Sequence, residues 1–119
     1  MMHQNGRKKL NRKTGHRKAL LRNQVIHLIN YGFLNTSKVR AKEVQRMAEK
    51  MVTVARDGYN FNTIRRLKSE LPYSVTAITK LIKEIAPQYA TRPGGYTRII
   101  SLGARTSDTA PVARLEWVQ

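Results

Sequence analysis

The sequence contains no cysteine in its 119 residues, and this absence excludes several classes of protein. Without a thiol there is no disulfide framework, no cysteine nucleophile and no cysteine-ligated zinc site. No apolar run approaches the roughly 18 residues of a membrane-spanning helix. No signal-peptide core follows the N-terminus either. We therefore expect neither a disulfide-stapled secreted domain nor a membrane-spanning protein, and a reducing compartment agrees with the composition.

Acidic residues are scarce and unevenly placed. Seven Asp and Glu stand against 23 Lys and Arg, which gives a formal charge of +16, and no acid precedes Glu43. A charge of this size on a small domain opposes compaction and attracts polyanions. Nucleic acid is the leading partner, and an anionic membrane surface is the alternative. Membrane binding needs bulky apolar residues beside the cations, and the basic N-terminal segment offers only Leu10.

Groups for catalysis are also missing at workable spacings. The three histidines, His3, His16 and His27, are scattered in the basic N-terminal region with no carboxylate near them in sequence. A histidine-based metal site needs further ligands at helical or turn spacing. There is no Gly-rich phosphate loop followed by Lys-Ser or Lys-Thr, and no G-x-S-x-G turn. We expect no enzymatic activity, no metal, no cofactor and no small-molecule substrate.

The N-terminal residues predict an arm. Residues 1–15 carry Arg7, Lys8, Lys9, Arg12 and Lys13 but a single leucine. Such a segment buries too little apolar area to offset its ordering entropy. We expect residues 1–15 to be a flexible or extended RNA-binding arm and residues 16–119 to form one globular α/β domain. The alternative is a solvated basic tail without a partner.

Four stretches with helical periodicity follow the arm. The first covers 16–31, and Gly32 is placed to end it in a left-handed conformation. Thr36 or Ser37, Asn60 or Asn62, and Ser74 are the expected N-caps of the next three. Pro72 and Pro87 are expected to end the third and fourth helices. The expected apolar stripes are Leu21, Val25, Leu28 and Ile29; Ala41, Val44, Ala48, Met51 and Ala55; Phe61, Ile64, Leu67 and Leu71; and Val75, Ile78, Leu81, Ile82 and Ile85.

Three strands complete the expected secondary structure. A short β-capable run covers 33–36, and a second strand covers 96–102. Ile99 and Ile100 point to opposite faces of that second strand, so we expect both of its faces to be covered. Residues 103–111 contain Gly, Ser, Asp and Pro and predict a hairpin loop. Ala113, Leu115 and Trp117 alternate with polar residues in a final half-buried strand.

The most unusual chemistry lies at residues 92–98, which we call the Gly-Gly bend. Pro93 pushes Arg92 away from helical conformation, while Gly94 and Gly95 permit positive φ and close approach of a second backbone. Arg98 and the aromatic residue Tyr96 follow at once. Cations beside aromatic rings suit phosphate contacts and stacking on splayed bases. A tight turn that feeds a strand is the alternative, and the charge of the whole chain favours RNA binding.

Four separated segments resemble the L-seventeen family of bacterial large-subunit ribosomal proteins. They are residues 6–12 (GRKKLNR), residues 16–23 (HRKALLRN), residues 38–43 (KVRAKE), and the block from Ala86-Pro87 through Arg92 and the sequence GGYTR on to Ala110-Pro111. They stand in family order and span nearly the whole chain. The last block is the distinctive one.

The resemblance implies an α+β fold: a two-layer domain in the order α-β-α-α-α-β-β, with a small mixed three-stranded sheet packed on helices and a basic N-terminal arm. It implies a structural constituent of the large ribosomal subunit that binds 23S-type rRNA and neighbouring proteins near the peptide-tunnel exit. It places the protein on a cytoplasmic ribosome, with an organellar ribosome as the alternative although no transit peptide is evident. The expected rRNA contacts are Arg7, Lys8, Lys9, Asn11, Arg12, His16, Arg17, Arg22, Arg92, Gly94, Gly95, Tyr96 and Arg98.

A free architectural or regulatory DNA- or RNA-binding protein is the competing interpretation. Such a protein usually shows a recognition helix with a mixed polar face and an apolar stripe for dimerisation. Neither feature is evident in the sequence.

Overall fold

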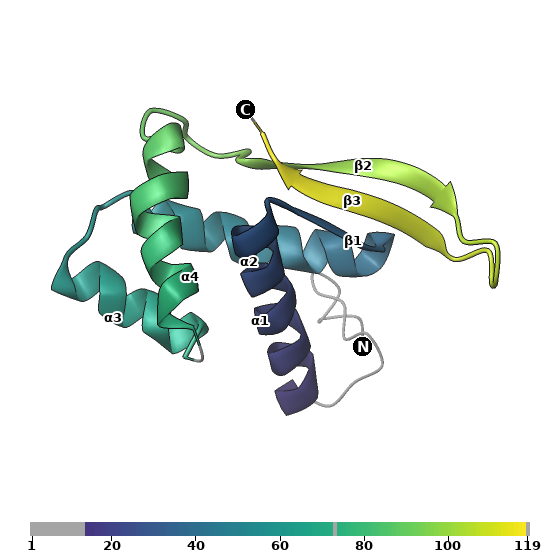
Figure 1. Cartoon of the computed structure of the whole chain (residues 1–119), viewed down its shortest axis with the longest axis horizontal. Helices are drawn as coiled ribbons and strands as arrows, with labels where there is room; N and C mark the ends of the chain where they lie inside the picture. Colours follow the sequence, from purple (N-terminus) through teal and green to yellow (C-terminus); the bar gives the residue numbers. More distant parts are fainter. Residues whose placement is uncertain (1–13, 73, 119) are drawn as a thin grey trace, which may run out of the picture.

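The computed structural model describes residues 14–72 and 74–118. It contains helices and strands in the predicted order, and its α+β class confirms the sequence-based expectation (Figure 1). The elements are α1 (Thr14–Tyr31), β1 (Phe33–Ser37), α2 (Lys38–Ala55), α3 (Phe61–Glu70), α4 (Val75–Lys80), the π-helical turn η1 (Leu81–Ile85), the 3₁₀ turn η2 (Ala86–Tyr89), β2 (Thr97–Ala104) and β3 (Pro111–Trp117).

The helix ends follow local capping chemistry. Gly32 adopts φ 85°, and its N–H donates to the Leu28 carbonyl to end α1. The Ser37 side chain accepts from the Arg40 N–H at the start of α2. Asn60 and Ser74 do the same for α3 and α4. These caps confirm the predicted starts, because each side-chain oxygen satisfies a backbone donor that has no intrahelical partner.

Pro87 does not end the fourth helix, and the sequence-based prediction was wrong there. The chain stays helical from α4 through η1 and η2 to Tyr89. Pro87 lies in the first positions of the 3₁₀ turn. Pro87 has no N–H to continue the helical hydrogen bonding, and the chain passes at this point from the π-helical turn to the tighter 3₁₀ turn. The change of helix type accommodates the proline.

The sheet has the order β1-β3-β2 and is antiparallel throughout, not mixed as expected. Because β3 returns between β1 and β2, each neighbouring pair runs in opposite directions. Leu115 of β3 pairs with Leu34 on one side and Ile99 on the other. A bulge between Ser101 and Gly103 bends β2. The β2–β3 hairpin extends past the helices at one end of the molecule (Figure 1).

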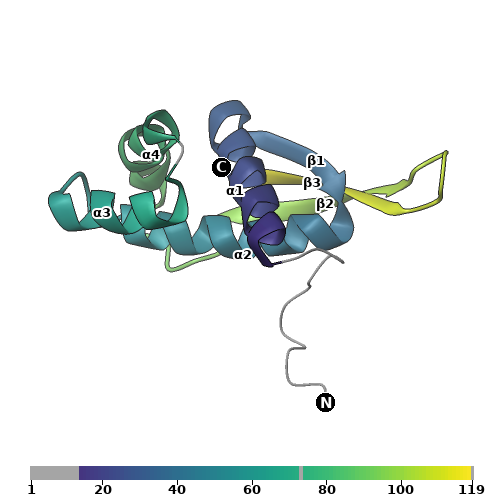
Figure 2. The same ribbon diagram turned by 90° about the horizontal axis from the view of Figure 1, so that it is seen from below.

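The helices cover one face of the sheet only. Figure 2 shows α2 running beneath the strands, with α1 crossing it. Ala113 and Leu115 are fully buried on this inner face, whereas Ile100 and Leu102 remain exposed. The expectation that both faces of 96–102 are covered was therefore wrong. One covered face is usual for a small antiparallel sheet.

The buried stripe of α2 matches the prediction in full, but the stripes of α3 and α4 begin differently. Ala41, Val44, Ala48, Met51 and Ala55 are all buried. Phe61 and Val75, the first residues of α3 and α4, are exposed by 77% and 59%. The smaller Thr63 and Ala77 are buried in the first turns of those helices instead. Their size lets the helices approach the core closely.

We predict that Leu28→Ala lowers the free energy of unfolding by about 2–5 kcal/mol, because it removes a side chain with no exposed area and leaves a cavity. Leu102→Ala is the matched control: the same atoms are removed from a side chain that is 52% exposed. It should change stability by no more than about 0.5 kcal/mol. Urea unfolding of both variants measures the difference, and equal costs would contradict the assigned core.

Candidate nucleic-acid interface

A basic groove lies between α1, α2 and α3. Its volume is about 630 Å³, and its apolar floor includes Leu21, Met47 and Val54. The cations that line it are Lys18, Arg22, Arg46, Lys50 and Arg66. The carboxylates that line it are Glu43 and Glu70, so five positive charges face two negative ones and leave an excess of three. The groove therefore presents a surface suited to polyanions.

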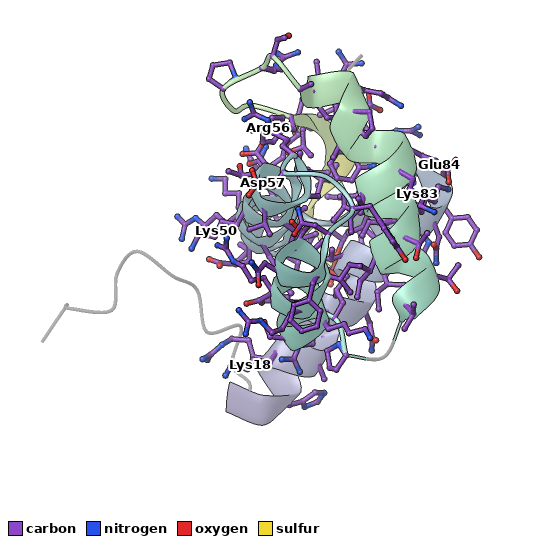
Figure 3. The ribbon with its side chains drawn as sticks, turned by 90° about the vertical axis from the view of Figure 1, so that its left-hand side faces the viewer. Lys18, Lys50, Arg56, Asp57, Lys83 and Glu84 are labelled. Atoms are coloured by element: carbon purple, nitrogen blue, oxygen red, sulfur yellow. The ribbon has the colours of Figure 1, made fainter. Side chains whose placement is uncertain are left out.

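The basic groove continues along α2 to the Gly-Gly bend. A second hollow of about 420 Å³ is lined by Arg46, Glu49, Lys50, Thr53, Gly94 and Tyr96. Arg46 and Lys50 line both hollows, so the groove and the bend meet on the outer side of α2. Figure 3 shows Lys18, Lys50 and Arg56 along one side of the molecule. The Glu49 carboxylate is already engaged, because it accepts from the N–H and the hydroxyl of Thr97.

Arg56 holds the bend in place. Its guanidinium donates to the Tyr96 hydroxyl and to the Ala90 carbonyl, each at 2.9 Å. Gly94 and Gly95 adopt φ 148° and 65°, as the sequence predicted for residues that need positive φ. Apart from the glycine itself and its two neighbours in the chain, no described heavy atom lies within 4 Å of the position that a Cβ would take on Gly94 or Gly95. The backbone of the bend is thus positioned by α2 and open to a ligand.

Both tyrosines near the bend belong to the core, which corrects the predicted stacking role. Tyr96 is 1% exposed and Tyr89 is 3% exposed. Their ring centroids are 5.2 Å apart, and Tyr89 also lies 6.3 Å from the ring of Trp117. Burial raises the pKa of Tyr89, and its hydroxyl donates to the Val118 carbonyl. A ring enclosed in this way cannot stack on a base, so Tyr96 supports the bend from within.

Arg98 is engaged in an ion pair on the outer face of the sheet. Its Nε and Nη2 atoms donate to Glu116 Oε2 at 2.8 and 2.6 Å, and Arg114 Nε donates to Glu116 Oε1 at 2.8 Å. Hydrogen bonds from these two arginines hold the pKa of Glu116 below its usual range, and the bond from Arg98 has the larger effect. Arg98 lines neither hollow. The structure does not gather it with the groove cations.

The other predicted contact residues divide into two groups. His16 and Arg92 are exposed, Arg17 is half-buried, and Arg22 lines the groove with its guanidinium 3.5 Å from the Ser69 carbonyl. Predictions at Arg7, Lys8, Lys9, Asn11 and Arg12 lie outside the described residues.

The predicted set of contacts omitted four groove cations and the positioning residue Arg56. Lys18 precedes Arg22 by four residues on α1, and Arg46 precedes Lys50 by four on α2. This spacing places each pair on one helical face and was the available signal. Arg66 and Arg56 carried no comparable signal, because their roles depend on contacts between elements.

Within residues 14–72 and 74–118, no three histidine or acidic side chains are grouped closely enough to hold a metal ion. No helix in the same part of the chain is long and apolar enough to cross a membrane.

We predict that Glu116→Gln destabilises the protein at neutral pH and has no effect in strong acid. The folded-state pKa of Glu116 is depressed, so its stabilisation is present above the unfolded pKa and is lost as pH falls through the folded value. Thermal unfolding at neutral and acidic pH measures the difference from the parent. Glu84→Gln, at an exposed glutamate, is the control. A Glu116→Gln deficit that persists in strong acid would contradict the proposed linkage.

The chain matches one known protein family over most of its length. The sequence model described as "Ribosomal protein L17" matches residues 20–118. Three relatives bear the name "Large ribosomal subunit protein bL17". The relative from Bdellovibrio bacteriovorus is 47% identical over 111 residues, which are 93% of this chain and 60% of the relative. The relative from Geotalea daltonii is 42% identical over 119 residues, 100% of this chain and 65% of the relative.

The relative from Moorella thermoacetica is 44% identical over 111 residues, 93% of this chain and 97% of the relative. The chain thus spans slightly less than two thirds of the first two relatives and nearly all of the third. The family match begins six residues into α1 and includes the Gly-Gly bend and the hairpin. The resemblance seen in the sequence is confirmed, and the chain belongs to the ribosomal protein L17 family.

Proposed function

We propose that this chain is a non-enzymatic structural protein of the large ribosomal subunit and binds 23S-type rRNA through the basic groove and the Gly-Gly bend. The observation that carries the proposal is the continuous surface on which five groove cations lead to an open glycine backbone. Membership of a ribosomal protein family supports it. The names of the relatives indicate that the subunit is the large one.

The groove suits recognition of the phosphate backbone and of shape. Lysine and arginine side chains line it, and its floor is aliphatic and sulfur-containing rather than aromatic. Phosphate contacts fix position and orientation without reading sequence. At the bend, Gly94 and Gly95 let an RNA strand approach the main chain, where a side chain would hold it away. Helical RNA is recognised mostly through such contacts.

The proposed contact set combines residues found by sequence and by structure. Tyr96 is left out of the set because its buried ring supports the bend from within. Arg98 is left out because its guanidinium is bonded to Glu116. The set comprises Arg7, Lys8, Lys9, Asn11, Arg12, His16, Arg17, Lys18, Arg22, Arg46, Lys50, Arg66, Arg92, Gly94 and Gly95. Residues 1–15 are proposed as an RNA-binding arm and residues 16–119 as the globular domain, and the last two residues of the arm, Thr14 and Gly15, already belong to α1.

We further propose that the protein belongs to a cytoplasmic ribosome and lies near the peptide-tunnel exit, where it contacts neighbouring large-subunit proteins. This part of the proposal rests on the family resemblance. The rival function is a free architectural or regulatory DNA- or RNA-binding protein, because a basic groove also accepts DNA phosphates. Sedimentation separates the two. The proposed function requires the protein to remain with large subunits after a high-salt wash, whereas release into the supernatant with equal affinity for duplex DNA favours the rival.

We predict that Lys50→Gln weakens rRNA binding and lowers the slope of log affinity against log salt by roughly 0.7 to 0.9, the value for one lost phosphate contact. Lys50 lines both hollows. Lys68→Gln is the matched control, since it removes the same charge from an exposed residue of α3 that lines neither. Titration at several salt concentrations gives both slopes. Equal slopes for the two variants would show that total charge, and not the groove, determines binding.

We also predict that deleting residues 1–13 lowers the salt slope by about 3.5 to 4.5, because five cations are removed. These cations are Arg7, Lys8, Lys9, Arg12 and Lys13. The thermal unfolding midpoint should change little, since α1 begins at Thr14 and the core residues lie beyond it. An unchanged slope would show that the arm makes no phosphate contact.

A further inference from the structure

Two exposed aromatic rings lie where the chain passes from α2 to α3. Tyr59 is 58% exposed and Phe61 is 77% exposed. Asn60, between them, caps α3 through its side chain, which accepts from the Thr63 N–H. The cap and the buried residues of α3 fix this turn without either ring. Side chains so exposed contribute little to the hydrophobic stabilisation of the fold.

Each ring has a cation close to it. Arg65 Cζ is 5.8 Å from the centroid of Phe61, and Lys83 Nζ is 4.5 Å from the centroid of Tyr59. The cations come from two different elements, α3 and η1. No ion pair joins Arg65 or Lys83 to a carboxylate in the part of the chain that the structure describes. Glu84, which follows Lys83 in the chain, is the acidic residue beside this cluster (Figure 3).

The combination matches the chemistry of an unpaired nucleotide. An aromatic ring stacks on any base, and an adjacent cation meets the phosphate. Protein–protein interfaces are enriched in aromatic residues and arginine but depleted in lysine. Here the Tyr59 ring is paired with Lys83, and no acidic partner neutralises either cation in the part of the chain that the structure describes. The two cations attract an anion, and an RNA loop provides phosphates for the cations together with bases for the rings.

The cluster lies apart from the basic groove. Arg66 lines the groove, whereas the preceding residue of α3, Arg65, is placed over Phe61. Figure 3 shows Lys83 on the opposite side of the view from Lys50, which lines both the groove and the hollow at the bend. Neither ring lines the groove or the hollow at the bend. A ligand of the rings would therefore lie apart from the phosphate backbone proposed for the groove.

We propose that Tyr59 and Phe61, with Arg65 and Lys83, form a stacking site for unpaired nucleotides of a single-stranded RNA segment. The site rests on the proposed function in that both require RNA as the partner. It adds recognition of bases to a protein whose groove is suited only to backbone. The rings provide the stacking surfaces, and the two cations hold the flanking phosphates.

The test uses the full chain and two charge-matched probes: a short oligouridylate and an abasic ribose-phosphate oligomer of the same length. Combined Tyr59→Ala and Phe61→Ala substitution should weaken oligouridylate binding by about tenfold or more, as loss of base stacking does. Binding of the abasic oligomer should not change, because every cation remains. Phe61→Trp should bind oligouridylate at least as tightly as the parent. Tyr31→Ala removes an exposed aromatic side chain at the end of α1 and should leave both affinities unchanged.

Three results would overturn the inference. Unchanged oligouridylate binding by the double variant would show that no base stacks on the rings. Equal losses on both probes would show that the rings only position Arg65 and Lys83. Normal oligouridylate binding together with lost retention on large subunits would assign the rings to a protein partner. Failure of the groove proposal is recognised by a different measurement. Lys50→Gln and Lys68→Gln would then show equal salt slopes for rRNA binding, independently of how the ring variants bind oligouridylate.

Discussion

The apolar stripe of α2 is the constraint on which the remaining structure depends. A chain with a formal charge of +16 resists compaction, and it needs a buried surface large enough to offset that repulsion. The helix contacts α1, α3, all three strands and the turns that follow α4. Ala41, Ala48 and Ala55 keep the stripe narrow, so the neighbouring elements approach closely. The opposite side of the same helix carries Lys42, Arg46 and Lys50. One helix thereby provides both the centre of the core and the middle of the basic groove.

This double role explains how the Gly-Gly bend is held next to the groove. Gly94 and Gly95 carry no side chain and impose no rigidity on the bend, so other residues must hold it. Arg56 and Thr53 of the α2 region meet the buried hydroxyl of Tyr96, and Glu49 accepts from Thr97 at the start of β2. Hydrogen bonds from a charged group are about twice as strong as neutral ones. The aromatic ring that adjoins the glycines thus acts as an anchor inside the protein, while the glycine backbone remains open outside.

Sequence reasoning succeeded where local chemistry decides and failed where contacts between distant residues decide. The cap at Ser74 and the turn at Gly32 depend on a few adjacent residues and were predicted, and Ser37 and Asn60 were each one of two predicted candidates. The position of Tyr96 depends on Arg56, which is forty residues away in the chain. An aromatic residue beside two glycines is equally compatible with an exposed or a buried ring. The groove similarly arises only when three helices pack together. Its cations on α1 and α2 showed helical spacing, but nothing in the sequence aligned Arg66 with them.

The few acidic side chains determine which cations remain available for a polyanion. Glu116 engages Arg98 and Arg114, and Asp108 engages Arg105 and the Ala110 N–H in the hairpin loop. These pairs order the hairpin and reduce its net charge. In the described residues, Arg46 is the single groove cation with an ion-pair partner, Glu43. Two acids therefore face three arginines in the β2–β3 hairpin, whereas a larger surplus of positive charge remains over α1, α2 and α3. Exposed like charges repel one another, so this surplus of positive charge lowers the stability of the folded state. A bound polyanion would reduce that repulsion. Neutralisation by RNA would thus stabilise the helical side of the domain more than the hairpin.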